Sequence, residues 1–190
     1  MTGVALTDRE LVQHLRTFCE SAIGFTGRAI ASLLHTALTD EATRGALVAG
    51  CAGAAEAVDE SLRVDPPVTY ALRTCTAPAT VAGTAVEPGD RVLVSIVAVN
   101  RDPQARGRHV TLGRGPHVCL GAALYRLLAA RTTGALLRRL PDIALAPGFV
   151  YEDHPWFTGH APQRLDVTFT VEPDEAAPGH GTPDAGRLRR

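Results

Sequence analysis

The chain has 190 residues, enough for one domain with a hydrophobic core or for two very small ones. Hydrophobic residues make up 45% and charged residues 21% of it, a balance that excludes disorder of the whole chain. The 19 basic residues are all arginine and face 20 acidic residues, giving a net charge of −1. This excludes a generic basic nucleic-acid binder and a polybasic membrane-binding face, and the lack of lysine excludes Schiff-base chemistry.

From the sequence we expect neither a targeting segment nor a membrane span. No apolar run approaches the ~18 residues of a membrane-spanning helix, and the first ten residues lack the core of a signal peptide. The cysteines are widely spaced and form no C-x-x-C pair: Cys19, Cys51, Cys75 and Cys119. We therefore expect reduced thiols in a cytoplasmic protein, with the first three of them either core or inert thiols and with no structural zinc site.

The first third of the chain predicts helices. Thr7 and Glu10 have the spacing of a capping box, and Gly24 is expected to interrupt the helix that they begin. A second apolar stripe follows over residues 25–38. The first helix carries a stripe that predicts either core packing or an interface: Leu11, Leu15, Phe18 and Ala22.

Two further helices are expected before the character of the sequence changes. Asp40 suits the start of a short helix, and residues 53–64 form an Ala-rich helix that Pro66 and Pro67 end. Residues 68–76 alternate between apolar and polar, which predicts a half-buried strand. The almost wholly apolar stretch 92–99 fits either a buried strand or a helix.

The remainder predicts a loop, a helix and a strand in that order. Residues 100–116 form a polar loop rich in glycine and arginine, and residues 120–140 follow as an amphipathic helix. The alternation over 165–171 indicates a strand, and residues 172–190 have the composition of a disordered tail.

The most specific stretch runs from Gly113 to Gly121 and presents one cysteine, Cys119, just before a helix. The positive end of a helix and nearby cationic side chains favour the thiolate form of a cysteine. Glycines let backbone N–H groups approach such a sulfur, and a single cysteine thiolate is an adequate axial ligand for heme iron. A second feature is Glu60-x-x-Arg63, whose members share a helix face and can form an ion pair.

Taken together, these stretches resemble the cytochrome P-450 family of heme-thiolate monooxygenases. The likeness covers roughly residues 20–170 and includes Asn100-Arg101-Asp102-Pro103, which is similar to the start of the family's meander. The resemblance implies an α+β, mainly helical fold: the C-terminal half of a cytochrome P-450 with a small antiparallel sheet. The implied domain spans residues 1–171.

The resemblance also implies roles for single residues. Cys119 would be the heme iron ligand, and Glu60 and Arg63 would form the pair that organises the fold. Arg73 and His117 would hold the heme propionates. Three glycines would shape the loop around the sulfur: Gly113, Gly115 and Gly121.

The sequence also departs from the family's pattern. The chain has about half the usual length, so the distal roof of the heme pocket would be missing. Over residues 25–30, Arg28 and Ala29 replace the acid and the alcohol of the oxygen-activating helix, which would place a cation near the iron. The meander loop is short, and Arg106 or Arg108 would have to complete the triad with Glu60 and Arg63.

These observations predict a heme-binding oxidoreductase that inserts oxygen into a small organic substrate. Electrons would come from a separate, ferredoxin-type redox partner because no G-x-G-x-x-G loop is present. The departures predict poor turnover by this chain alone. One alternative is a non-enzymatic auxiliary protein that activates a glycosyltransferase in natural-product biosynthesis, and another is a decayed gene fragment. Uncovered apolar surface would favour a partner protein or a homodimer.

Overall fold

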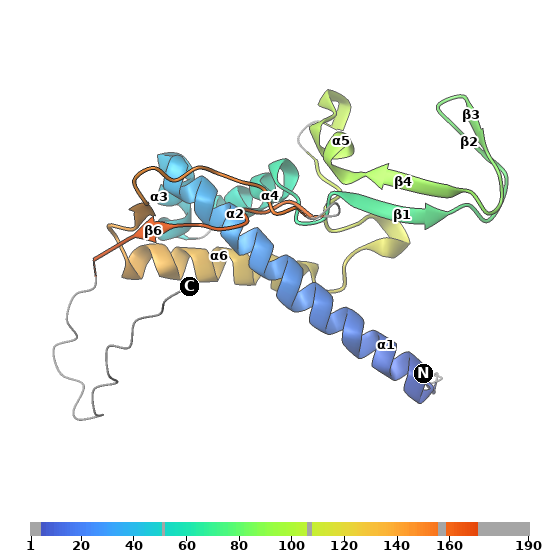
Figure 1. The fold of residues 1–190 in the computed structure, drawn as a ribbon, viewed down its shortest axis with the longest axis horizontal. Coiled ribbons are helices and arrows are strands. Elements are labelled where there is room, and N and C mark those ends of the chain that lie inside the picture. Colours follow the sequence, from blue (N-terminus) through green and yellow to red (C-terminus); the bar gives the residue numbers. More distant parts are fainter. Residues whose placement is uncertain (1–4, 51, 106–107, 156–158, 171–190) are drawn as a thin grey trace.

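The computed structural model describes residues 5–50, 52–105, 108–155 and 159–170. Its longest feature is a continuous helical rod formed by α1 (Asp8–Cys19), the π-helical segment η1 (Glu20–Phe25) and α2 (Thr26–Thr39). Figure 1 shows this rod crossing α6 and projecting beyond the other helices at its α1 end. The expected interruption at Gly24 is wrong: Gly24 lies within η1 and the helical path continues through it, because a glycine costs a helix only about 1 kcal/mol.

The helix starts agree with the sequence signals. The backbone N–H of Glu10 donates to Thr7 Oγ1 at 3.3 Å, and the backbone N–H of Thr7 donates to Glu10 Oε2 at 2.9 Å. The capping box is therefore confirmed. The carboxylate of Asp40 caps α3 (Glu41–Ala49) by accepting from the backbone N–H of Thr43 at 2.8 Å.

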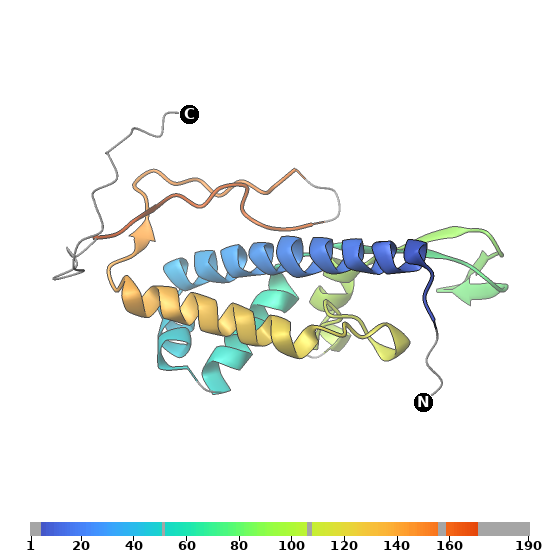
Figure 2. The ribbon, with the colours of Figure 1, turned by 90° about the horizontal axis from the view of Figure 1, so that it is seen from below.

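Four helices enclose the core. They are α2, α3, α4 (Ala52–Val64) and α6 (Ala122–Arg139), and Figure 2 shows α6 beside the rod. Gly134 lets α6 approach α3 closely, because a Cβ there would lie 2.5 Å from the Leu47 carbonyl oxygen. The core cluster consists of Ala29, Leu33, Leu34, Ala37, Leu47, Ala54, Val58, Leu62, Tyr125, Ala129, Leu137 and Ile143.

A small antiparallel ribbon extends from the helices. Strand β1 (Tyr70–Thr74) pairs with β4 (Arg91–Ser95), so that Tyr70 faces Ser95 and Thr74 faces Arg91. The hairpin β2 (Ala79–Val81) and β3 (Thr84–Val86) lies at its far end (Figure 1).

The apolar stretch 92–99 fits either a strand or a helix by its sequence, and in the structure it contains the end of a strand and the start of a helix. Strand β4 ends at Ser95, and α5 (Ile96–Arg101) begins there because Ser95 Oγ accepts from the backbone N–H of Ala98 at 3.2 Å. A short 3-10 turn, η2 (Pro103–Ala105), follows α5.

The C-terminal strand is much shorter than the alternation over 165–171 predicts. Within the described residues of that stretch, only β6 (Val167–Thr168) pairs, with β5 (Ala144–Leu145). The described parts of the connection between them run back over the helices (Figure 1). The expected tail over 172–190, as well as Cys51, lies outside the described residues. None of the helices in the described ranges is long and apolar enough to cross a membrane. The mainly helical α+β class with small antiparallel sheets is confirmed.

Candidate functional site

The glycine-rich loop places Cys119 at the entrance to α6. The loop folds through the 3-10 turn η3 (Gly115–His117) and returns so that the backbone N–H of Cys119 donates to the Leu112 carbonyl at 2.8 Å. The backbone N–H of Ala122, the first residue of α6, donates to the Cys119 carbonyl at 3.1 Å. The sulfur is thereby presented, exposed, just before a helix N-terminus, as the sequence predicts.

The three glycines of this loop have different reasons to be glycine. Gly113 has φ +76°, and a Cβ there would overlap the carbonyl group of His117. Gly115 has φ +59° but open space around it, so only its backbone conformation disfavours a side chain. At Gly121 a Cβ would lie 3.9 Å from Cys119 Sγ, an ordinary contact distance. Gly113 is therefore the most constrained position of the loop.

Cys119 lines a cleft between the rod and the start of α6. The cleft has a volume of about 300 Å³, and its walls are largely apolar. Its apolar side chains are open to solvent: Phe18 is 63%, Leu124 59% and Leu120 95% exposed. The full lining is His14, Thr17, Phe18, Ser21, Ala22, Thr26, Cys119, Leu120, Gly121, Leu124, Tyr125 and Leu128.

The rod contributes different residues to this cleft from those expected. Arg28 and Ala29, which were assigned to the oxygen-activating position, do not line it. Arg28 instead places its guanidinium carbon 5.4 Å from the centroid of the Phe25 ring, and Ala29 is buried in the core. The π turn of η1 changes the phase of the helix just before these residues, which an alignment by residue type cannot register.

Five polar side chains of the cleft were not predicted as site residues: His14, Thr17, Ser21, Thr26 and Tyr125. Ser21 lies three residues beyond Phe18, one helical turn along the predicted stripe, so helical spacing could have indicated it. Tyr125 is 8% exposed, and its hydroxyl has no hydrogen-bond partner among the described residues. Burial, together with the nearby charge of Cys119, raises the pKa of Tyr125.

The two residues expected to hold propionates are exposed and lie outside the lining of the cleft. The Arg73 side chain extends from β1, where its Nη1 donates to the Leu72 carbonyl at 2.8 Å. His117 ends the 3-10 turn of the cysteine loop. Their role toward the propionates therefore stays a prediction.

Glu60 and Arg63 form a close pair on α4. Arg63 Nε and Nη2 donate to the two carboxylate oxygens of Glu60 at 2.8 and 2.6 Å. Arg63 Nη1 also donates to the Asn100 carbonyl at 3.1 Å, so the pair connects α4 to α5. The hydrogen bond from Arg63 and, less strongly, the charges of Arg63 and His109 hold the pKa of Glu60 below its usual value.

The third member of the expected triad is not an arginine in the described part of the chain. Arg106 lies outside the described residues, and Arg108 is exposed. His109 instead contributes the additional charge that acts on Glu60. His109 also approaches Asp59, with 3.3 Å between Nε2 and Oδ1.

We expect the Glu60–Arg63 pair to make stability depend on pH. Because the folded-state pKa of Glu60 is lowered, its contribution is present above the unfolded-state pKa of about 4.3 and is lost as the pH falls through the folded-state value. Glu60→Gln should therefore flatten the fall in unfolding free energy between about pH 6 and pH 3. Since the Glu60 side chain is 60% exposed, the difference at neutral pH should stay below about 1 kcal/mol.

Urea unfolding at a series of pH values measures this effect. Glu56→Gln is the matched control, because Glu56 is exposed on the same helix. Parallel pH profiles for the wild type and Glu60→Gln would contradict the expectation.

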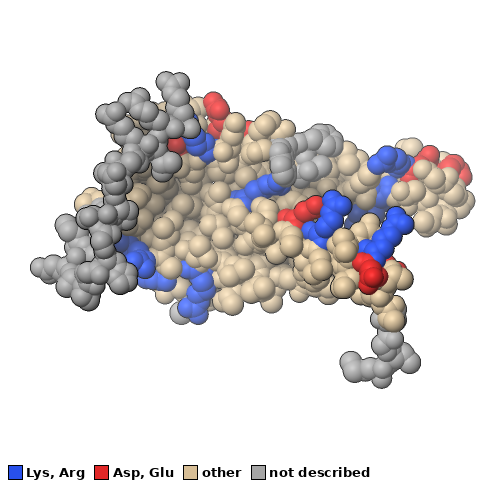
Figure 3. Space-filling model, turned by 60° about the horizontal axis from the view of Figure 1, so that its bottom comes forward, with Lys and Arg blue, Asp and Glu red and all other residues tan. Residues whose placement is uncertain are grey.

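A neighbouring charged cluster was also missed. Asp59 accepts from Arg126 Nε at 2.7 Å and thus ties α4 to α6, while Asp59, Arg108, His109 and Arg114 line an open hollow. Figure 3 shows that the charged side chains on one face of the molecule form separate small groups within a broad uncharged surface. A continuous basic stripe is not visible on that face.

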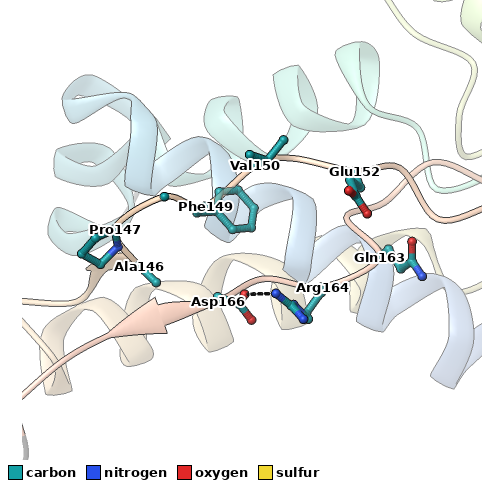
Figure 4. Close-up of a pocket in the computed structure, with 9 residues that line it drawn as sticks. Ala146, Pro147, Phe149, Val150, Glu152, Gln163, Arg164 and Asp166 are labelled. Atoms are coloured by element: carbon teal, nitrogen blue, oxygen red, sulfur yellow. Dashed lines mark ion pairs between the residues drawn. The ribbon is translucent and has the colours of Figure 1, made fainter.

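A larger, more polar cavity of about 580 Å³ lies between the C-terminal segments. Figure 4 shows its walls, with the Arg164–Asp166 ion pair (2.6 Å between Nη2 and Oδ2) on one side and Phe149 on the other. None of the residues predicted for the site lines it. Within the described ranges, no group of three or more His, Cys, Asp or Glu side chains is placed to hold a metal ion.

Comparisons with known proteins agree with this fold. Residues 54–105 match the family model described as Cytochrome P450. The biotin biosynthesis cytochrome P450 of Bacillus subtilis (strain 168) is 33% identical over 125 residues, which cover 60% of this chain and 31% of that protein. The cytochrome P450 monooxygenase PikC of Streptomyces venezuelae is 32% identical over 173 residues, which cover 83% of this chain and 42% of that protein.

A solved structure supports the same fold. The crystal structure of CYP109E1 from Bacillus megaterium in complex with testosterone superposes with a TM-score of 0.81 at 24% identity, covering 90% of this chain and 51% of that one. The chain belongs to the cytochrome P450 family. It spans less than half the length of the two curated relatives.

Proposed function

We propose that the chain binds heme through the thiolate of Cys119 and acts as a monooxygenase-type oxidoreductase. The observation that carries this proposal is the open, apolar cleft in which Cys119 is the only sulfur among the lining residues. Heme is a large, mostly apolar plate whose affinity comes from burial against such walls. A single thiolate from a loop shaped by Gly113 fits the donor set of a heme-thiolate site.

When bound, the heme iron supplies the one-electron and oxygen chemistry that side chains lack. Cys119 would hold the iron, while Phe18 and Leu124 would cover apolar area from opposite walls and exclude water. Arg73 and His117 are the proposed partners of the propionate groups, because both are exposed and carry or can carry positive charge.

The cleft offers hydroxyl groups for proton transfer, but it lacks the acid of the expected acid and alcohol pair. The hydroxyls of Ser21 and Thr26 lie on the rod side, and the lining includes no Asp or Glu. We therefore expect slow proton delivery and low turnover by this chain alone. The exposure of Leu120 shows that the cleft is open to water, which should lower turnover further. The electron donor is proposed to be a separate ferredoxin-type protein, which the family normally uses.

A carbon monoxide difference spectrum of the hemin-reconstituted, reduced chain tests the proposal. We expect a thiolate-type Soret band in the wild type and its complete loss in Cys119→Ala. Cys19→Ala is the matched control, since Cys19 is also exposed but does not line the cleft. A folded chain that stays colourless, or an unchanged band in Cys119→Ala, would contradict heme-thiolate binding.

The second candidate function is a heme-free auxiliary protein that activates a glycosyltransferase. A folded but colourless chain would favour it. Neither this alternative nor the expected homodimer gains support from the cleft or from the relatives.

A further inference from the structure

Asn100 is the most completely bonded buried polar side chain near the cysteine loop. It lies in the last turn of α5 and is 1% exposed, so its amide must find partners within the protein. Asn100 Nδ2 donates to the hydroxyl oxygen of Thr111 at 2.8 Å and to the carbonyls of Arg63 and Leu62 at 3.2 and 3.4 Å. Asn100 Oδ1 accepts from the backbone N–H of Val110 at 2.9 Å.

The sequence of α4 explains why these bonds are needed. A helix carbonyl normally accepts from the N–H four residues later, but Pro66 and Pro67 have no N–H to offer Leu62 and Arg63. Asn100 supplies donors to both carbonyls, and Thr111 Oγ1 adds a bond of 2.6 Å to the Leu62 carbonyl. The proline pair therefore leaves two carbonyl groups without their helical donors, and Asn100 and Thr111 donate to them instead.

The same residues form the base of the cysteine loop. Val110, whose N–H donates to Asn100, accepts at its carbonyl from the backbone N–H of Gly113 at 2.8 Å. The Leu112 carbonyl, next to Thr111, accepts from the backbone N–H of Cys119 at 2.8 Å. A short series of hydrogen bonds thus runs from the end of α4 through Asn100 to Cys119.

We propose that Asn100 is a positioning residue for Cys119, with Thr111 as its partner. It fixes the segment 110–112 against the end of α4 and thereby sets where the loop presents the sulfur. Its action passes through the backbone of that segment. The consequence for iron rests on the proposed function, but the positioning itself is a property of the chain without heme.

Hydrogen–deuterium exchange on the full-length, heme-free chain tests this inference. Asn100→Asp keeps the acceptor for Val110 and removes both donor hydrogens, while Thr111→Val removes the hydroxyl with little change of shape. We expect both variants to speed exchange of the Cys119 amide by about tenfold or more. Arg44→Gln is the control, because it removes bonds of 3.1 and 2.8 Å to the carbonyls of Ile143 and Pro141, beyond the other end of α6.

The control separates positioning from general loss of stability. Arg44→Gln should lower the melting temperature and leave exchange of the Cys119 amide unchanged. Equal acceleration in Arg44→Gln, or wild-type exchange in Thr111→Val, would overturn the inference, also in the case that Asn100→Asp fails to fold. After addition of hemin, a shifted Soret band in Thr111→Val would support the inference. A wild type that takes up no hemin would refute the proposed function and leave the exchange result to decide on Asn100.

Discussion

Gly113→Ala is expected to destabilise the chain by about 3 kcal/mol or more and to abolish hemin uptake. Two independent costs add at this position. The left-handed backbone, with φ +76°, costs an L-residue about 1–2 kcal/mol. The new methyl group would also overlap the carbonyl of His117, so the loop must open, and overpacking of this kind costs about 1–3 kcal/mol more.

Gly115→Ala separates these two costs. Gly115 has φ +59°, but no atom lies within 4 Å of a Cβ built there. This variant should lose only about 1–2 kcal/mol and retain hemin binding. Urea unfolding and hemin titration of both variants measure the difference. Equal losses in the two variants would show that the contact with His117 does not constrain the loop.

The contrast between the two glycines shows what a sequence can and cannot reveal. The pattern around Cys119 predicts a glycine-shaped loop before a helix, because turn chemistry is decided within a few residues. Which of the glycines has no room for a side chain depends on how the loop folds back on His117. The capping box of Thr7 and Glu10 and the cap at Asp40 are also decided within a few residues, and the structure confirms both.

Features that depend on residues far apart in the chain were not predicted from the sequence. The sequence marks Asn100 only as part of a motif, because its partners Leu62 and Arg63 lie 38 and 37 residues away in the chain. The rod wall of the cleft was misassigned at Arg28 and Ala29, because a π turn leaves no signature of residue type. The sequence also does not decide whether the apolar stripe on α1 packs in the core or forms an interface.

The structure decides that question against the core. Leu11, Leu15 and Phe18 are 48%, 55% and 63% exposed, so the stripe is not buried within the described chain. Phe18 belongs to the cleft, which connects this exposed face to the site of Cys119. Apolar surface of this kind is costly unless it is covered, and the proposed heme would cover the part around Phe18 and Leu124.

Leu124→Asp is therefore expected to weaken hemin binding by about a hundredfold while leaving the fold intact. A leucine covered by a ligand contributes about 2 kcal/mol, and the burial of a carboxylate adds at least another 1 kcal/mol to the cost. Because Leu124 is 59% exposed on the first turn of α6, the free chain loses little packing, and an acidic residue suits a helix N-terminus.

Leu127→Asp is the matched control, since Leu127 is 53% exposed on the same helix and does not line the cleft. It should leave the hemin affinity unchanged within about threefold. Hemin titration followed by absorbance measures both affinities, and circular dichroism with thermal melting verifies that both variants fold. A similar loss of affinity in the two variants would mean that hemin binds the whole exposed face of α6 without preference for the cleft beside Cys119.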